Sequence, residues 1–239
     1  MIFYISDLHF GHQNAIRFDK RPFASVEEMD QTIIQNWNNT VKPEDTVYIL
    51  GDMVWAKAKG WPGYLRQLNG HKILIKGNHD PNGFDKETMA LLDGVYDYLE
   101  ITDEGRHVVL SHYPIPMHKS AYNPNVYMLY GHVHTTREYH FIQELRKEIR
   151  DTALEAAHHN RGQWYNVGCM LPHINYTPRT LNEILAADTE EENHRELKEY
   201  VSKDSVDAIA SMLQSGTVDP ETAAQMLRDI KTRKISNMS

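Results

Sequence analysis

Short apolar runs that end in small and polar residues recur along the first half of the chain. Five of these runs have the length and composition of strands and cover residues 2–5, 46–50, 72–76, 107–110 and 126–130. After the first run, Ser25 and Glu28 form a capping-box pattern ahead of apolar residues that recur at helical spacing. Because strands alternate with helical segments, the pattern predicts an α/β fold.

The second half of the chain contains a charged helical segment, one more strand and a change in composition. Helical spacing within residues 138–159 predicts a surface helix near the site, and residues 163–167 are typical of a strand. An acidic run then separates a main domain, residues 1–187, from a C-terminal part, residues 188–239. Helical spacing interrupted by Gly216 predicts a small helical hairpin there, which would cover the main domain or join two chains in a homo-oligomer.

Composition places the chain among globular proteins without a membrane span. Of its 239 residues, 41% are hydrophobic and 24% are charged, which suits one domain with a small appendage. No apolar run approaches the roughly 18 residues that cross a bilayer, and the chain opens without a secretory leader pattern. The single Cys169 cannot form an internal disulfide, so we expect a cytoplasmic protein. The formal net charge of -8 disfavours binding to long nucleic acid.

Polar side chains with ligand chemistry follow each of the five predicted strands. They are Asp7 and His9, then Asp52, then Asn78, then His112, and finally His132 and His134. Ligands of open α/β sheets bind beyond the carboxyl ends of the strands, so we expect these separate clusters to meet there. Each cluster alone is also typical of turn chemistry, and their shared position at strand ends is what favours a single site.

The donor types in these clusters favour a metal centre. Two carboxylates, one amide and four imidazoles, without a thiolate, suit manganese, iron or zinc and disfavour a structural zinc site or a calcium site. Two divalent ions about 3.5–4 Å apart that share one carboxylate would use all these ligands and would polarise a phosphoryl oxygen. We expect manganese, with iron, zinc or nickel as alternatives.

The order of the five clusters resembles the calcineurin-like metallophosphoesterase superfamily. The matching motifs are Asp7-x-His9, Gly51-Asp52, Gly77-Asn78-His79-Asp80, His112 and Gly131-His132-x-His134. The resemblance implies a four-layer α/β/β/α sandwich of two mixed sheets flanked by helices. Protein phosphatases of this superfamily typically continue Gly-Asp with Asp-Arg-Gly and read Gly-Asn-His-Glu. This chain instead has Met53 and Asp80, so we expect a small bacterial or phage-type member.

The resemblance also implies a role for each matching residue. One ion would be held by Asp7, His9, Asp52 and His134. The other would be held by Asp52, Asn78, His112 and His132, with Asp52 bridging the two ions. His79 would contact the phosphoryl group and protonate the leaving oxygen, and Asp80 would orient His79 by hydrogen bonding. Candidates for binding substrate are His12, Arg17 and Lys119. The alternative is an exposed loop histidine for His12 and a solvated face for Arg17.

These residues together predict a metal-dependent phosphoesterase. The expected reaction is in-line attack of water on phosphorus, with the phosphoryl charge spread over both ions and His79 and no covalent enzyme intermediate. We expect the substrate to be a small phosphodiester or phosphomonoester, such as a nucleotide. The alternatives are a nuclease that acts on nucleic-acid phosphodiesters and a non-catalytic metal-binding scaffold, which the complete ligand set disfavours.

Overall fold

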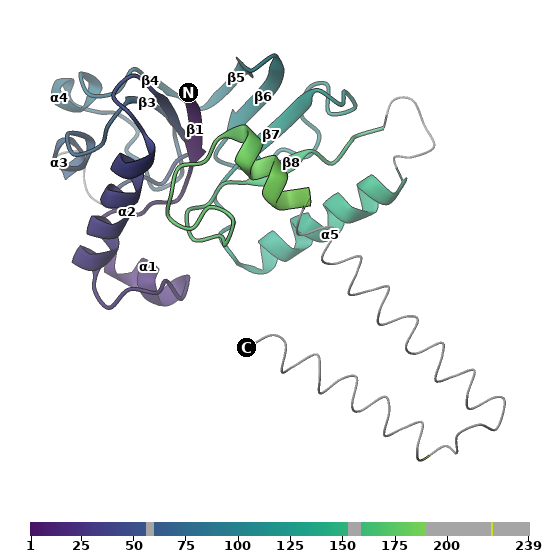
Figure 1. Ribbon diagram of the computed structural model, residues 1–239, viewed down its shortest axis with the longest axis horizontal. Helices are drawn as coiled ribbons and strands as arrows, with labels where there is room; N and C mark the ends of the chain where they lie inside the picture. The colour runs from purple at the N-terminus through teal and green to yellow at the C-terminus, as the bar shows by residue number, and fades with distance from the viewer. Residues whose placement is uncertain (56–59, 153–158, 190–220, 222–239) are drawn as a thin grey trace. The chain divides into compact units, whose positions relative to one another are not determined.

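The computed structural model describes residues 1–55, 60–152, 159–189 and 221 (Figure 1). The chain divides into two compact units, Met1–Ile184 and Leu185–Ser239, and the first unit contains the strands named below. The predicted C-terminal helical hairpin lies outside the described residues, so the domain boundary between residues 187 and 188 stays a prediction. No helix within the described ranges is long and apolar enough to cross a bilayer.

The first sheet holds three of the strands that the apolar runs predicted. Its strands are β1 (Ile2–Ile5), β2 (Thr46–Ile49), β3 (His71–Ile75) and β4 (Gly94–Tyr96), in that order, and all neighbours are parallel. An isolated antiparallel bridge joins Tyr4 to Arg179. The first sheet therefore combines parallel and antiparallel pairing, as expected for a mixed sheet. Because the strands are parallel, the loops that follow β1, β2 and β3 lie at one edge.

The second sheet also has four strands and combines both orientations. It contains β5 (Tyr98–Asp103), β6 (Arg106–Ser111), β7 (Val126–Tyr130) and β8 (Trp164–Asn166); β5 is antiparallel to β6, and the other neighbours are parallel. Beyond the ends of β1 and β8, Ser6 and Gly168 form a parallel bridge that joins the two sheets. The polar loops of both sheets therefore converge on the same region.

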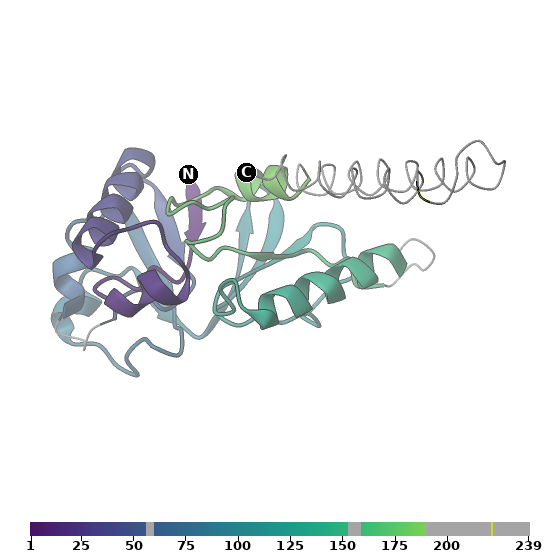
Figure 2. The same ribbon diagram turned by 90° about the horizontal axis from the view of Figure 1, so that it is seen from below.

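Helices flank both sheets, which confirms the predicted α/β class (Figure 1 and Figure 2). They are α1 (Gln13–Phe18), α2 (Val26–Thr40), α3 (Trp61–Leu65), α4 (Lys86–Met89) and α5 (Arg137–Thr152), and residues 181–189 are also helical. Helices α1 to α4 lie beside the first sheet, and α5 lies beside the second.

Helix α2 begins where the capping pattern predicts it. The Ser25 hydroxyl accepts a hydrogen bond from the Glu28 backbone N–H at 3.2 Å. The Glu28 carboxylate in turn accepts from the Ala24 backbone N–H at 2.7 Å, one residue earlier than a standard capping box requires. The apolar face of the helix then buries Ile33 and Trp37 in the core.

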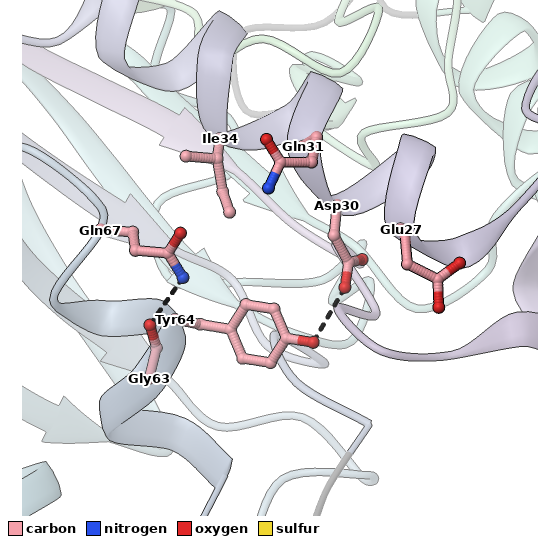
Figure 3. A pocket seen from close by; sticks show the side chains of 7 residues that line it. All are labelled: Glu27, Asp30, Gln31, Ile34, Gly63, Tyr64 and Gln67. Carbon is pink, nitrogen blue, oxygen red and sulfur yellow. Dashed lines mark hydrogen bonds between the residues drawn. The ribbon is translucent and has the colours of Figure 1, made fainter.

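A surface pocket of about 340 Å³ lies between α2 and α3 (Figure 3). At its edge the Tyr64 hydroxyl donates to the Asp30 carboxylate at 2.8 Å, and the same carboxylate accepts the Gly11 backbone N–H at 3.0 Å. These two bonds connect both helices to the loop after β1. Asp30 therefore helps to fix the loop that carries His9.

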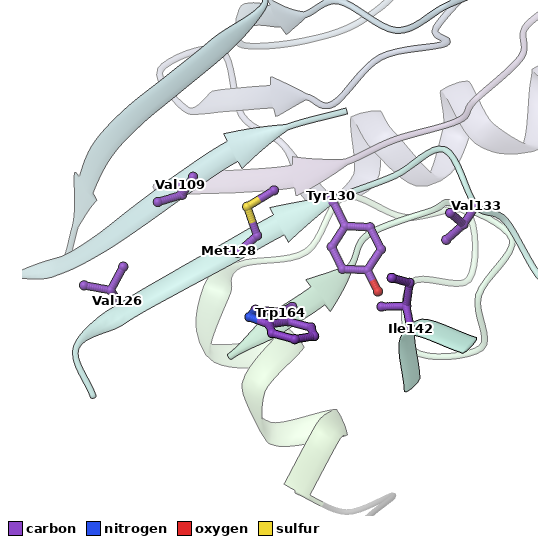
Figure 4. Packing of buried hydrophobic residues seen from close by; sticks show 7 residues of the cluster. All are labelled: Val109, Val126, Met128, Tyr130, Val133, Ile142 and Trp164. Carbon is purple, nitrogen blue, oxygen red and sulfur yellow. The ribbon is translucent and has the colours of Figure 1, made fainter. Parts of the chain in front are cut away.

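Helix α5 packs its apolar face on the second sheet (Figure 4). Ile142 belongs to a buried cluster that includes Tyr130 of β7 and Trp164 of β8. The Arg146 guanidinium lies over the ring of Tyr165, with 4.5 Å between its central carbon and the ring centroid. The helix predicted in the charged segment is therefore confirmed as far as Thr152, residues 153–158 lie outside the described residues, and the inner face of the helix is part of the core.

Strands β4 and β5 and helices α1 and α4 were missing from the sequence prediction. β4 has three residues and α4 has four, and neither is long enough to show periodicity. β5 is exposed or half-buried at every residue except Asp103, so it lacks the continuous apolar run that identified the other strands. Tertiary pairing with β6 is what makes this segment a strand.

Candidate metal centre

Five of the predicted ligands lie in two overlapping groups beyond the strand ends. The ligand atoms of Asp7, His9 and His134 lie within 4.8 Å of one another, and so do those of Asp7, Asp52 and His112. Asp7 belongs to both groups. Carboxylate oxygens and imidazole nitrogens are the donors that manganese, iron and zinc accept in proteins, so the chemistry of both groups fits such ions.

The remaining two predicted ligands adjoin the second group. His112 Nε2 lies 3.0 Å from the side-chain oxygen of Asn78, and the ring of His132 packs edge-on against the ring of His112 with 5.0 Å between centroids. Asp52 Oδ2 lies 3.6 Å from His112 Nε2 and 3.8 Å from His9 Nε2. Asp52 of the second group therefore also adjoins His9 of the first group, as a bridging ligand would.

Five of these ligands have a backbone conformation that side chains rarely adopt. Their φ angles are 56° at Asp7, 52° at His9, 53° at Asp52, 70° at His132 and 43° at His134. Each residue with positive φ other than glycine costs about 1 kcal/mol or more, and such strain persists only where the surrounding structure enforces it. The concentration of this strain on the predicted ligands indicates that the loops are shaped for the site.

Two glycines allow the loops after β2 and β3 to touch. Gly51 has a φ of 86°, and a Cβ added there would lie 2.7 Å from the Cα of Gly77. A Cβ added at Gly77 would collide with the side chain of Asp52 and would lie 2.6 Å from its backbone nitrogen. The contact brings Asp52 beside Asn78 and His79.

Asp80 has a different partner from the one that the sequence led us to expect. Its carboxylate accepts hydrogen bonds from the backbone N–H groups of Gly77 at 2.8 Å, Asp52 at 2.9 Å and Met53 at 3.1 Å. Burial raises the pKa of Asp80 to about 6, with the charge of Asp52 adding to the effect. The expectation that Asp80 orients the His79 ring is therefore corrected: Asp80 ties together the loops after β2 and β3.

His79 lies on the open side of the cluster. Its backbone N–H donates to Asp52 Oδ1 at 2.9 Å, and its side chain is 43% exposed with Nε2 4.0 Å from Asp52 Oδ2. The ring is tilted against Trp55, with 4.8 Å between centroids. This position, exposed and beside the ligands, suits a side chain that contacts substrate.

His134 has a carboxylate partner that sequence reasoning missed. Its Nδ1 lies 2.7 Å from Asp19 Oδ1, and Asp19 is paired with the buried Arg21 at 2.8 Å. Burial acts to lower the pKa of His134, but the hydrogen bonds with Asp19 and Asp7 raise it to about 10. Arg21 also donates to the backbone carbonyl of Asp7 at 2.9 Å, so the Asp19 and Arg21 pair supports two predicted ligands at once.

The pKa shifts of three other predicted ligands, His9, His132 and Asp7, favour the forms that bind metal. Burial, with the nearby charge of His134, lowers the pKa of His9 to about 3, and burial also lowers the pKa of His132. Burial alone would raise the pKa of the Asp7 carboxyl, but the hydrogen bond and charge of His134 hold it below its usual range. His112 Nδ1 lies 2.7 Å from the Leu50 carbonyl oxygen, a contact that fixes the orientation of the ring with Nε2 on the side of the cluster.

The three candidates for binding substrate have different surroundings. His12 is buried and stacks on Trp55 with 3.8 Å between ring centroids. Arg17 is exposed, and its guanidinium carbon lies 5.1 Å from the ring centroid of Phe18. Lys119 Nζ lies 3.5 Å from a carboxylate oxygen of Glu100 in β5. The structure therefore brings His12 to the site and places Lys119 against the second sheet.

A sequence model of the calcineurin-like phosphoesterase family matches residues 1–210, which is most of the chain. The chain belongs to this family, and it is a metal-dependent phosphoesterase. The family uses divalent metal ions, and the candidate ligand groups at the strand ends are where this chain offers carboxylates and imidazoles for them.

Three relatives indicate how this chain compares with known proteins. It is 40% identical over 154 residues to the uncharacterized protein MJ1445 of Methanocaldococcus jannaschii, across 62% of this chain and 78% of that protein. It is 33% identical over 129 residues to the Gene 66 protein of Mycobacterium phage L5, across 46% of this chain and 62% of that protein. A crystal structure of a protein of unknown function from Aquifex aeolicus, AQ665, matches with a TM-score of 0.55 and 30% identity, across 78% of this chain and 98% of that chain. The family expected from the motifs is confirmed, and the similarity to the phage protein fits the expected small bacterial or phage-type member.

Proposed function

We propose that this protein hydrolyses a small phosphomonoester or phosphodiester, such as a nucleotide, at a centre of two divalent metal ions. The observation that supports this proposal best is the pair of overlapping ligand groups, which share Asp7 and in which Asp52 of the second group lies 3.8 Å from His9 of the first. Overlapping groups of this kind suit two ions that are close enough to act on one phosphoryl group.

The expected ligand sets are those of the sequence resemblance. One ion would be held by Asp7, His9, Asp52 and His134, and the other by Asp52, Asn78, His112 and His132. When bound, the ions would polarise the phosphoryl oxygens and lower the pKa of water. Manganese is favoured because the donors are oxygen and nitrogen without thiolate, with iron, zinc and nickel as alternatives.

The protein's own side chains would then position the ester and supply the proton. The exposed imidazole of His79, 4.0 Å from Asp52, is the group placed to donate a proton to the leaving oxygen. Asp80 would hold the loop of His79 in place through the three backbone N–H groups that it binds. Asp19 would keep His134 oriented, because Nδ1 is engaged and Nε2 remains directed at Asp7.

A small substrate is favoured over long nucleic acid. The formal net charge of the chain is -8, and a protein that grips many phosphates needs a basic surface instead.

The direct test is turnover of model esters by protein that has been stripped of metal and reloaded. The assay would first use p-nitrophenyl phosphate and bis-p-nitrophenyl phosphate, each with manganese, iron, zinc and nickel in turn. Nucleotides and short DNA would then be assayed as substrates in the same way. We expect hydrolysis with manganese and faster turnover of nucleotides than of DNA. If no ester is hydrolysed with any of the four metals, the proposed function is wrong.

A further inference from the structure

Trp55 differs from the other tryptophans of the chain because it is exposed. Its exposed fraction is 42%, whereas Trp37 and Trp61 are 0% exposed and Trp164 is 1% exposed. Its backbone N–H donates to the Phe10 carbonyl at 2.8 Å, within a parallel bridge between Phe10 and Val54. A large apolar side chain is therefore held at the surface by backbone bonds to the loop after β1.

One face of the Trp55 indole is already covered by a second ring. The imidazole of His12, itself buried, stacks on it with 3.8 Å between centroids and 5° between planes. Since His12 covers this face, the exposed 42% of the side chain lies elsewhere on the indole. The stack fixes the orientation of the indole, so that its exposed part does not need to be ordered when a ligand arrives.

The stacked rings of Trp55 and His12 lie beside the predicted metal ligands. The centroid of Trp55 lies 4.8 Å from that of His79 and 6.1 Å from that of His9, and both rings are tilted relative to the indole. His79 in turn lies beside Asp52. A phosphoryl group at the ligands and a planar ring on Trp55 would therefore be separated by a short spacer such as a sugar.

We propose that Trp55, backed by His12, is a stacking platform for a planar ring on the ester, so that the substrate is a nucleoside phosphoester. This inference rests on the proposed function and narrows it to one class of substrate. An oriented indole suits this task because every base has a π-face that can stack on an aromatic side chain. Stacking of one base on an aromatic side chain corresponds to about 5- to 150-fold in affinity.

Intrinsic fluorescence provides a binding test that does not depend on turnover. Because three of the four tryptophans are buried, quenching by a bound base reports on Trp55. The full chain of His79→Asn, which should keep both ions but turn over slowly, would be titrated with AMP in the presence of manganese, and the affinity of ribose 5-phosphate, which lacks the base, would be measured by its displacement of AMP. We expect saturable quenching by AMP and binding at least about 5-fold tighter than that of ribose 5-phosphate. Equal affinity for the two probes would overturn the platform.

Substitutions test whether the difference in affinity between AMP and ribose 5-phosphate comes from the indole ring of Trp55. Trp55→Leu should abolish the preference for AMP over ribose 5-phosphate, measured by calorimetry, and Trp55→Phe should retain most of it. Phe141→Ala is the control, since it removes an aromatic side chain of α5 that is 62% exposed, and it should change neither affinity. If Trp55→Leu keeps the preference for AMP, the proposal is wrong.

Kinetics separate this proposal from the function on which it rests. In Trp55→Leu, KM for AMP should rise by about 5- to 150-fold, while KM for glycerol phosphate should stay unchanged. Equal changes in KM for both esters would refute the platform but would not contradict the proposed phosphoesterase function. Absence of all hydrolysis would refute the proposed function, and the fluorescence titration would still decide the platform. Tighter binding of a short single-stranded DNA than of AMP would keep the platform but assign nucleic acid as the source of the base.

Discussion

Replacing Gly77 with alanine tests how closely the loops after β2 and β3 must approach. The added Cβ would lie 2.6 Å from the Asp52 backbone nitrogen, and ordinary contact begins at 3.4 Å, so the loops must separate by the difference, about 0.8 Å. A displacement of about 1 Å at a catalytic site can lower the rate about 100-fold. We therefore expect Gly77→Ala to lower kcat/KM by about 100-fold and to weaken binding of both ions, because Asp52 of the second ligand group also adjoins His9 of the first.

Gly83→Ala is the matched control for this substitution. It adds the same methyl group six residues further along the chain, where an added Cβ meets no atom within 4 Å. Metal content by elemental analysis, steady-state kinetics and thermal unfolding would be measured on the same preparations, and the control should match the wild type in all three. If Gly77→Ala folds and keeps wild-type metal content and kcat/KM, the close approach of the two loops is not needed and the reasoning fails.

Three further predictions concern His79 and His134. His79→Asn should retain both ions in elemental analysis while turnover falls by about 10²- to 10⁴-fold; loss of metal would instead make His79 a ligand. In metal-free protein, Asp19→Asn should lower the pKa of His134 from about 10 toward 6.5 in an NMR titration, and an unchanged titration would contradict the Asp19 contact. The raised pKa of His134 stabilises the folded state below pH 6.5, and this stabilisation is lost as pH rises through about 10. Asp19→Asn loses part of this stabilisation, so its Tm should lie below that of the wild type at pH 6.5, and the difference should shrink toward pH 10. Manganese binding near pH 8 should release about one proton from His134, and calorimetry in two buffers of different ionisation enthalpy would detect it.

The predicted ligands were accessible from the sequence because each lies within a few residues of an apolar run. Asp7 lies two residues after the end of β1 and Asp52 three residues after the end of β2, so identifying the strands also located the ligands. Parallel pairing then brings the strand ends together without further information. Strands β1 to β3 and the polar edge that they share therefore follow from local patterns alone.

The features that the sequence did not reveal depend on contacts between distant segments. Asp19 and His134 are 115 positions apart, and nothing local in the sequence marks Asp19 as a partner. The stacking of Trp55 on His12 depends on the pairing of the loops after β1 and β2. Asp80 was expected to bind the adjacent His79, but the unpaired backbone N–H groups of two tightly packed loops are its partners instead.

Titration of the metal-free protein with manganese tests the proposed two-ion centre most directly. We predict two ions per chain for the wild type and weaker binding of both ions in Asp52→Asn, because Asp52 lies 3.6 Å from His112 and 3.8 Å from His9. The control is Asp93→Asn, since Asp93 pairs with His71 where β3 begins, and it should bind two ions normally. A wild-type protein that binds one ion or none, or an Asp52→Asn variant that binds two ions with unchanged affinity, would contradict the account.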